Sequence, residues 1–297
     1  MMRILRGIAS VIAAFIVAAL LTLGVMVQSS RTALERDYEV AGVELTLPTD
    51  EESIADGHRL YRAYGCVSCH LEDGGGRVVI PSGLGYIPAP DITIVANAWS
   101  VADLERVVRD GVRPSGSPTL LMPSHDYWYF DDETVARILA YTRTLPVAGR
   151  GYGGSSLTML GHVVHALDAI PLVPAERIHH GARRPSMGAP GSIELGRTLG
   201  RMCTGCHGDH LSGGPIPGTD TVQFGIPENL TPDASGLGGW SEAQFQIAMR
   251  TGVEPSGETI NNAWMPWRDC FQYMTDDELH SLWLFLREQP PLPFGGR

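Results

Sequence analysis

The 297-residue sequence contains no lysine, because all 22 of its basic residues are arginine. A lysine amine is therefore excluded as a catalytic nucleophile and as a docking charge. Acidic residues outnumber basic ones by 33 to 22, which gives a formal net charge of -11. Because nucleic-acid-binding proteins normally present a basic face, this balance excludes a nucleic-acid partner. Apolar residues form 43% of the chain, which excludes disorder for most of it.

Alternating strand patterns are also missing, whereas glycine and proline are abundant, with 35 and 21 residues. This composition predicts short helices joined by long, turn-rich loops. One uncharged apolar run is long, from Gly7 to Val27. As a helix it measures about 32 Å, which is enough to cross a hydrocarbon core of about 30 Å.

The flanks of this run predict its orientation. Arg3 and Arg6 precede it, so the positive-inside rule places the N-terminus in the cytoplasm and the rest of the chain on the periplasmic side. A cleaved signal peptide is the alternative, with Val27-Gln28-Ser29 as a weak cleavage site. The apolar region of a signal peptide is usually about 7–15 residues, shorter than this run, which favours an uncleaved anchor in the bacterial inner (cytoplasmic) membrane.

The five cysteines are too few for a dense disulfide framework, and four of them form two C-x-x-C-H motifs. Two thiols on one helical turn can reach the two vinyl groups of one porphyrin, and the next histidine is then held beneath the iron. A zinc half-site and a redox pair are alternatives, but the motif occurs twice and no thioredoxin-like βαβ pattern surrounds it. We therefore predict two covalently attached hemes c, held by Cys66, Cys69 and His70 and by Cys203, Cys206 and His207.

The two halves repeat beyond these motifs. Trp99–Gly116 aligns with Trp240–Gly257, with identical Trp, Ser, Ala, Arg, Gly, Val and Pro-Ser-Gly positions. The offset between the halves is 137 residues at the first motif cysteine and 144 at the last helix, so a few loop insertions separate two copies of one fold. The sequence therefore predicts an internal duplication.

Each unit is predicted to contain the same helices in the same order. A first helix leads into the motif, a second helix follows a serine N-cap and ends at a glycine, and a third helix ends before a proline. Ser241 and Gln244 form a capping box. The first helices are predicted at Glu51–Tyr64 and Ser192–Met202. The second helices run from Ser100 to Gly111 and from Ser241 to Gly252, and the third helices end at Pro146 and Pro290.

Met122 and Met265 occupy equivalent loop positions, each followed by proline. A thioether opposite the histidine gives His/Met coordination, which raises the reduction potential of a heme. Methionine is more often core filler, but both residues lie in loops and both units have one. His125 is an alternative iron ligand in the first unit. The second unit has Arg268 at the equivalent position. We therefore assign Met122 and Met265 as iron ligands.

Four further features are ambiguous. Trp99 and Trp240 are candidate heme-binding residues through their indole N–H groups, or helix-start packing residues. The Asp91-Ile-Thr and Asn229-Leu-Thr loops are either propionate contacts or simple turns. A carbonyl near Pro81 or Pro217 is expected to accept the Nδ1–H of each motif histidine. Cys270 is expected to be a free, partly buried thiol.

These motifs resemble a membrane-anchored diheme c-type cytochrome built from two class I cytochrome c domains. The likeness covers residues 51–289, and the chain is similar to the cytochrome subunits of periplasmic alcohol and gluconate dehydrogenases. Those subunits usually carry three hemes, and the glycine that often follows the heme histidine is Leu71 in the first unit. The resemblance implies an all-α fold and electron transfer.

The expected organisation is a transmembrane anchor at 1–30, a tether at 31–50, a cytochrome domain at 51–146, a connector with a helix (Leu157–Leu167) at 147–191, and a second cytochrome domain at 192–297.

We expect an electron carrier without catalytic residues of its own, whose head is mobile on the tether and whose two units pack together. Expected redox partners are a bc-type complex, an oxidase, a photosynthetic reaction centre or a dehydrogenase. The exported part has a charge of -13, so the partner surface should be basic or apolar. The alternatives are a diheme oxidoreductase, either a peroxidase or a thiosulfate-type enzyme, and a cytochrome subunit of a dehydrogenase.

Overall fold

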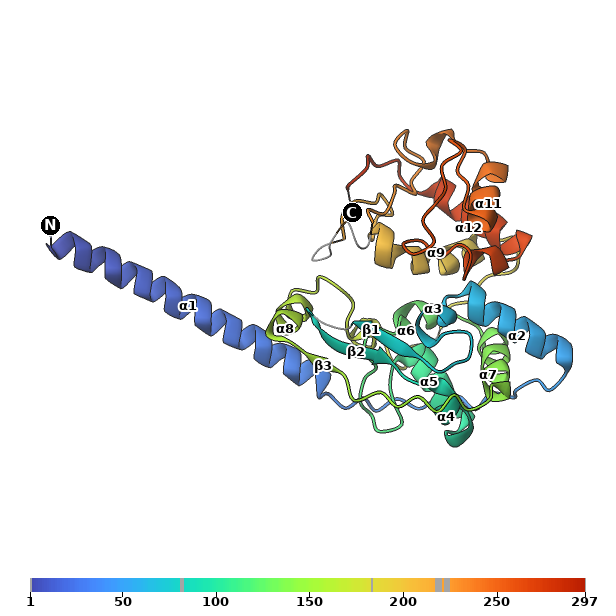
Figure 1. Ribbon diagram of the computed structural model, residues 1–297, viewed down its shortest axis with the longest axis horizontal. Helices are drawn as coiled ribbons and strands as arrows, with labels where there is room; N and C mark the ends of the chain where they lie inside the picture. Colours follow the sequence, from blue (N-terminus) through green and yellow to red (C-terminus); the bar gives the residue numbers. More distant parts are fainter. Residues whose placement is uncertain (1, 81–82, 183, 217–220, 222–224, 297) are drawn as a thin grey trace.

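The computed structural model describes residues 2–80, 83–182, 184–216, 221 and 225–296. A long helix projects from a head made of two lobes (Figure 1). The head is mostly helical, as the sequence predicts. The described helices are α1 (Met2–Leu34), α2 (Glu51–Ala63), α3 (Cys66–His70), α4 (Ile92–Ala98), α5 (Val101–Asp110), α6 (Ser124–Tyr127), α7 (Asp132–Thr144), α8 (Met159–Ala166), α9 (Ile193–His207), α11 (Glu242–Thr251) and α12 (Asp276–Glu288), with 3-10 turns η1 (Pro174–Arg177), η2 (Leu237–Gly239) and η3 (Phe271–Tyr273).

Helix α1 contains the apolar run and is the one described helix that is long and apolar enough to cross a membrane, with a mean hydropathy of 2.6. Its first 21 described residues are all exposed, and its side chains become covered only from Leu23 onward. The helix is 33 residues long, which corresponds to about 50 Å. Its N-terminal two thirds therefore stand clear of the head.

The core of each unit is a pair of crossing helices, α2 with α7 in the first unit and α9 with α12 in the second. A glycine lies at each crossing, because a β-carbon on Gly57 would overlap the carbonyl of Arg137 and one on Gly196 would overlap that of Ser281. The second helices, α5 and α11, have the predicted serine N-caps and left-handed glycine ends. The repeated fold thus follows the repeated sequence.

The prediction that no strands form is wrong in the first unit. Strands β1 (Arg77–Ile80), β2 (Gly85–Ala89) and β3 (Ser156–Leu157) make an antiparallel sheet in that order. Arg77 pairs with Ala89, and Gly85 pairs with Leu157. The β-branched residues of β1 pair with β2, and β2 in turn finds a partner strand in the connector, which no local pattern indicates.

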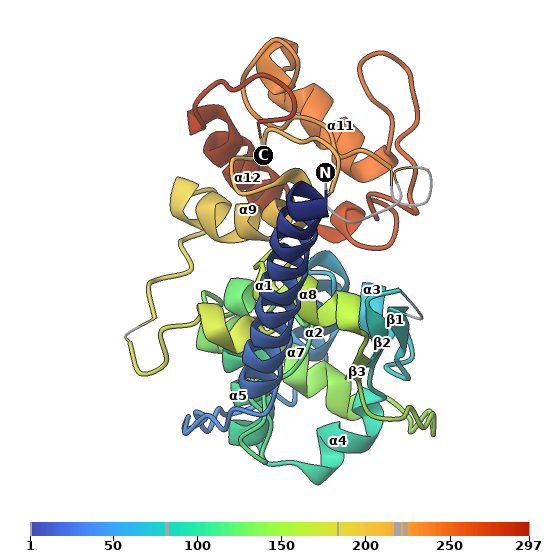
Figure 2. The same cartoon turned by 90° about the vertical axis from the view of Figure 1, so that its left-hand side faces the viewer.

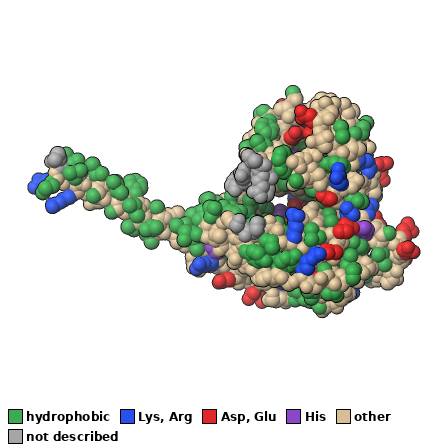
Figure 3. Space-filling view, viewed as in Figure 1, with side chains coloured by type: hydrophobic (Ala, Val, Ile, Leu, Met, Phe, Trp, Pro, Cys, Tyr) green, Lys and Arg blue, Asp and Glu red, His purple; other side chains and the backbone are tan. Residues whose placement is uncertain are grey.

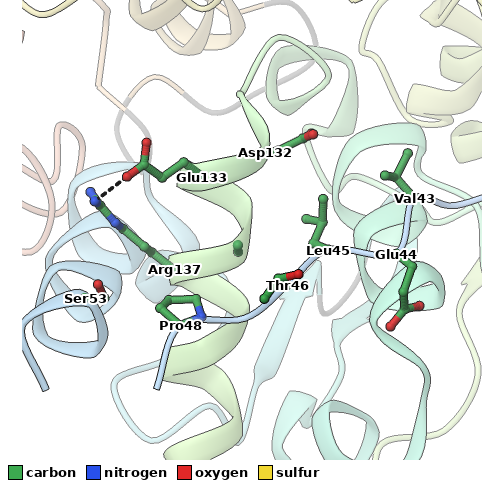
Figure 4. Close-up of a pocket in the computed structure, with 10 residues that line it drawn as sticks. Val43, Glu44, Leu45, Thr46, Pro48, Ser53, Asp132, Glu133 and Arg137 are labelled. Carbon is green, nitrogen blue, oxygen red and sulfur yellow. Dashed lines mark hydrogen bonds and ion pairs between the residues drawn. The ribbon is translucent and has the colours of Figure 1, made fainter. Parts of the chain in front are cut away.

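The prediction of a mobile tether is also wrong. The segment after α1 lies along the first unit, where the Tyr38 N–H donates to the Gly116 carbonyl at 2.9 Å. The Val43 N–H donates to the Glu105 carboxylate at 2.8 Å, and Leu45 is buried in the core. Figure 4 shows the stretch from Val43 to Pro48 running beside α7. The segment between α1 and α2, called the strap below, is therefore ordered and holds the head to α1.

The connector is bound to the first unit as well. Glu105, which is fully buried, accepts from Arg109 at 3.0 Å and pairs with Arg184 of the connector at 3.1 Å. Arg184 also pairs with Asp110 at 2.7 Å. Because the same Glu105 holds the strap, one buried carboxylate ties three separate segments together.

The two units form one body, as predicted. A single cluster of buried side chains contains Tyr64 and Phe130 of the first unit together with Met274 and Leu282 of the second. In two perpendicular views α9 lies at the boundary between the lobes, next to the first unit (Figures 1 and 2). The two motifs therefore lie close to the boundary that the units share.

Candidate functional site

Both C-x-x-C-H motifs lie on helices. The first motif is the short helix α3, separated from α2 by Gly65 in a left-handed conformation, and the second motif is the last part of α9. None of the five cysteines, all of which are described, is disulfide-bonded. Burial raises the pKa of Cys66 and that of Cys203 to about 12. A redox-active C-x-x-C pair needs a lowered pKa, so this environment argues against that alternative.

A metal-ion site of the zinc type also finds no support. Within the described residues no group of three or more His, Cys, Asp or Glu side chains is arranged to hold a metal ion. Each motif histidine instead stands with its own two cysteines, which is the donor set for a covalently attached heme.

The two motif histidines make the same hydrogen bond. His70 Nδ1 lies 3.0 Å from the Pro90 carbonyl oxygen, and His207 Nδ1 lies 2.7 Å from that of Glu228. A carbonyl only accepts, so Nδ1 carries the proton in both rings and Nε2 keeps its lone pair. That tautomer is the one that ligates a metal through Nε2.

The expected position of these carbonyls is wrong. Pro81 and Pro217, near which they were expected, lie outside the described residues, and the acceptors come 20 and 21 residues after the histidines. Both acceptors directly precede the Asp/Asn-x-Thr loops. The Thr93 N–H donates to Asp91 at 3.0 Å, and the Thr231 N–H donates to Asn229 at 2.9 Å. The repeated loops are thus turns that present a carbonyl to the histidine.

The residue after each histidine has an unusual backbone. Gly208 has φ 84° and ψ 163°, and Leu71 adopts nearly the same conformation with φ 62° and ψ 172°. This region is favourable for glycine and strained for leucine, at a cost of about 1–3 kcal/mol. The departure from the usual glycine therefore leaves the local geometry of the first motif unchanged. The Tyr61 hydroxyl, which donates to the Leu71 carbonyl at 2.7 Å, helps to hold it.

The two methionines lie in loops with matching hydrogen bonds. The Ser124 N–H donates to the Met122 carbonyl at 2.8 Å, and the Trp267 N–H donates to the Met265 carbonyl at 2.7 Å. Both methionines pack against the buried cluster that also borders Cys66 and Cys203. Two histidines whose tautomer makes Nε2 the ligating nitrogen, two thioethers and four thiols are the donors that two hemes c require. The residues present therefore fit the group that the sequence predicts.

Trp99 and Trp240 also occupy equivalent places, each immediately before the serine N-cap of α5 or α11. Both are partly buried against the same cluster. Among the described residues neither indole N–H has a hydrogen-bond acceptor from the protein, so both remain available to a bound group. Their assignment as heme-binding residues stays a prediction.

The boundary between the units has an approximate two-fold symmetry that the sequence analysis missed. The Arg201 guanidinium of α9 lies 3.7 Å from the centre of the Tyr129 ring, and that of Arg62 in α2 lies 4.1 Å from the centre of the Tyr273 ring. Tyr129 and Tyr273 are 144 residues apart, which is the repeat offset of this region. Each unit therefore presents the tyrosine before its last helix to an arginine near the other unit's motif.

Cys270 lies at the same boundary. Its Sγ is 3.2 Å from the Oγ of Ser68, one of the two residues between the cysteines of the first motif. It is 1% exposed. The thiol forms no disulfide, as expected, but it is fully buried where partial burial was expected. The loop that carries Met265 therefore touches the attachment motif of the other unit.

Buried ionisable groups surround the first methionine loop. Burial raises the pKa of Asp126 to about 7, against the opposing effects of Arg201 and Arg177. Burial also lowers the pKa of His125 to about 4. His125 therefore stays neutral at neutral pH, and the Nε2 of this rival ligand lies 3.7 Å from the Asp126 carboxylate.

Alkylation of Cys270 provides a test of this boundary. Burial raises the pKa of Cys270 to about 11, compared with about 8.5 for a free cysteine. Its thiolate is therefore roughly 300-fold scarcer than that of a free thiol near pH 7. We expect iodoacetamide to modify Cys270 more than 100-fold more slowly in the native protein than in urea, with the rate rising up to about pH 11. Fast native labelling at pH 7, followed by mass spectrometry, would show that the boundary opens.

The fold and the two repeated sites define the class of at least the first unit, which is a cytochrome c domain. Residues 52–141 match the family model for cytochrome c oxidase, cbb3-type, subunit III. This match contains the first motif and Met122.

Individual relatives extend the likeness to both units. The chain is 31% identical over 135 residues to a diheme cytochrome c-type protein of Cereibacter sphaeroides, covering 37% of this chain and 45% of the relative. It is 26% identical over 293 residues to the cytochrome c subunits of alcohol dehydrogenase (quinone) from Gluconacetobacter polyoxogenes and Komagataeibacter europaeus, covering 86% of this chain and 60% of each relative. The chain thus spans about half of the length of these relatives.

Proposed function

We propose that this protein is a diheme c-type cytochrome that carries electrons between a donor and an acceptor protein. The observation that carries the proposal is the matched histidine geometry, in which Nδ1 of both His70 and His207 donates to a carbonyl that precedes an Asp/Asn-x-Thr turn. When bound, each heme supplies a one-electron iron couple. The protein residues fix the ring orientation and tautomer of each histidine.

The remaining assignments follow the repeat. Each heme would be attached through two cysteines and ligated by one histidine and one methionine; these residues are Cys66, Cys69, His70 and Met122 in the first unit and Cys203, Cys206, His207 and Met265 in the second. Filling both axial positions with protein side chains favours electron transfer over peroxide or thiosulfate chemistry, which needs an open or unusual iron position. We propose domain limits of 51–146 and 192–297.

We further propose that α1 is an uncleaved anchor in the inner membrane and that the head lies on the periplasmic side. The relatives that are alcohol dehydrogenase subunits support a redox protein as the partner. A bc-type complex, an oxidase, a reaction centre and a dehydrogenase are all compatible with the acidic, lysine-free surface. Because lysine is absent, the partner contributes the positive charges or an apolar face.

Counting the attached hemes tests the proposal. We expect mass spectrometry of the intact protein to find two covalently bound hemes per chain. The variants Cys66→Ala and Cys203→Ala should each weaken the attachment of one heme only, because each leaves a single thioether bond at one site and both bonds at the other. Cys270→Ala is the matched control and should retain both hemes. A count of one in the unaltered protein would refute the diheme assignment.

A further inference from the structure

Helix α8 has its polar and apolar faces reversed relative to an ordinary surface helix. Its buried residues include His162 and His165, each 9% exposed. Met159, Leu160 and the adjacent Leu167 are instead 64%, 57% and 65% exposed. A short helix with this distribution leaves an apolar face without a partner within the described part of the chain.

The apolar face lies beside α1, since α8 packs along the C-terminal part of that helix (Figure 1). The side chains of α1 that lose exposure there are Leu23, Met26, Val27 and Ser30. Their spacing of three, four and seven residues defines one stripe. Three of them belong to the apolar run Gly7–Val27, so α8 overlaps the last five residues of this run, from Leu23 to Val27, which is a rise of about 6 Å.

Hydrogen bonds fix α8 in this position. The Ser30 hydroxyl of α1 lies 2.8 Å from His162 Nδ1 and 2.9 Å from His165 Nδ1, and His165 Nε2 lies 3.0 Å from the Glu176 carboxylate. On the other side, the Thr158 N–H donates to the Leu84 carbonyl at 3.0 Å. Helix α8 is therefore held to α1 and to the first unit at the same time.

We propose that α8 lies in the interfacial layer of the bilayer that α1 crosses, with Met159, Leu160 and Leu167 among the lipid acyl chains. This inference rests on the proposed anchor. Interfacial helices bury their apolar face about 5–10 Å below the headgroup boundary, which agrees with the overlap of about 6 Å. Hydrophobic side chains also continue from α1 onto the head where the two meet (Figure 3). The first unit is thus seated on the membrane at a fixed height.

Cysteine accessibility in vesicles tests this placement. The full chain, with its hemes attached, is reconstituted in phosphatidylethanolamine/phosphatidylglycerol vesicles and treated with a membrane-impermeant maleimide. We expect Leu160→Cys to react at least tenfold more slowly than Ile247→Cys, a control at 53% exposure on α11, and both to react alike in detergent-denatured protein. Phe15→Cys, at 73% exposure on α1, reports on the anchor itself.

A phospholipid with a photoactivatable diazirine in its acyl chain identifies what covers α8. Insertion into the segment from Leu157 to Leu167 would support lipid contact. Protection from maleimide without such insertion would indicate a second copy or another protein and would overturn the proposal. Fast reaction of Leu160→Cys with slow reaction of Phe15→Cys would also overturn it while leaving the anchor intact. If both react as fast as Ile247→Cys, the anchor fails as well.

Discussion

A Met265→His variant is expected to retain both hemes and to lower the reduction potential of one of them by on the order of 0.1 V, within the ~0.8 V range that axial ligands span. A thioether favours ferrous iron more than an imidazole does, so its replacement stabilises the oxidised state. Met122→His should lower the other potential by a similar amount. A spectroelectrochemical titration of each variant measures both potentials.

The control for this experiment is a methionine with no proposed role at the iron. Met274 is 2% exposed and corresponds to Phe130 in the first unit. Met274→Leu conserves volume and should cost less than about 1.5 kcal/mol while leaving both potentials unchanged. If neither histidine variant shifts a potential, the axial methionines have been assigned wrongly, and His125 becomes the first alternative for the first unit.

The parts of the fold that were predicted from the sequence depend on local interactions. The N-caps at Ser100 and Ser241 and the left-handed glycines at the ends of α5 and α11 are fixed by residues within one helical turn. Because the sequence is duplicated, each helix of the fold is predicted twice, once from each unit. For this reason the helices of both units, and the placement of the motif on a helix, could be predicted.

The missed features depend on contacts between distant residues. The strap was predicted to be mobile because nothing near Val43 reveals Glu105, which lies 62 residues away. The pairing of Gly85 with Leu157 is equally non-local. The carbonyls that accept from the motif histidines were expected closer to the motif in the sequence. They lie further along the chain because the sheet and loops that follow the motif come before the chain returns to the imidazole ring. The arginine–tyrosine contacts between the units had one signal in the sequence, the repetition of Tyr129 as Tyr273.

Glu278 is another residue that sequence reasoning missed, although it joins the two units. Its carboxylate accepts from Arg59 at 2.9 Å and from the Tyr64 hydroxyl at 2.8 Å, both of the first unit. It also accepts from the Thr275 N–H at 2.7 Å and so closes the capping box of α12. The side chain of Glu278 is 8% exposed, so little water can replace these contacts.

Replacing this carboxylate should weaken the unit boundary. In Glu278→Ala the half-buried Arg59 and the buried Tyr64 hydroxyl both lose a partner, and the cap of α12 opens. We expect the free energy of unfolding to fall by about 2–4 kcal/mol, measured by urea denaturation. Glu278→Gln should lose less, because glutamine preserves the capping box. Glu288→Ala, at the exposed end of the same helix, should change the free energy of unfolding by less than about 0.5 kcal/mol.

The Glu278→Ala variant also tests whether the boundary between the units supports electron transfer. Tunnelling falls steeply with distance, so a loosened contact between the motif of one unit and the methionine loop of the other should slow electron exchange between the two sites. Pulse radiolysis of Glu278→Ala, under conditions where the protein remains folded, measures this rate. We expect a slower rate than in Glu288→Ala, with both reduction potentials unchanged. A stability loss with an unaltered rate would mean that the arginine–tyrosine contacts and Cys270 hold the two sites in place without Glu278, and that the carboxylate serves folding alone.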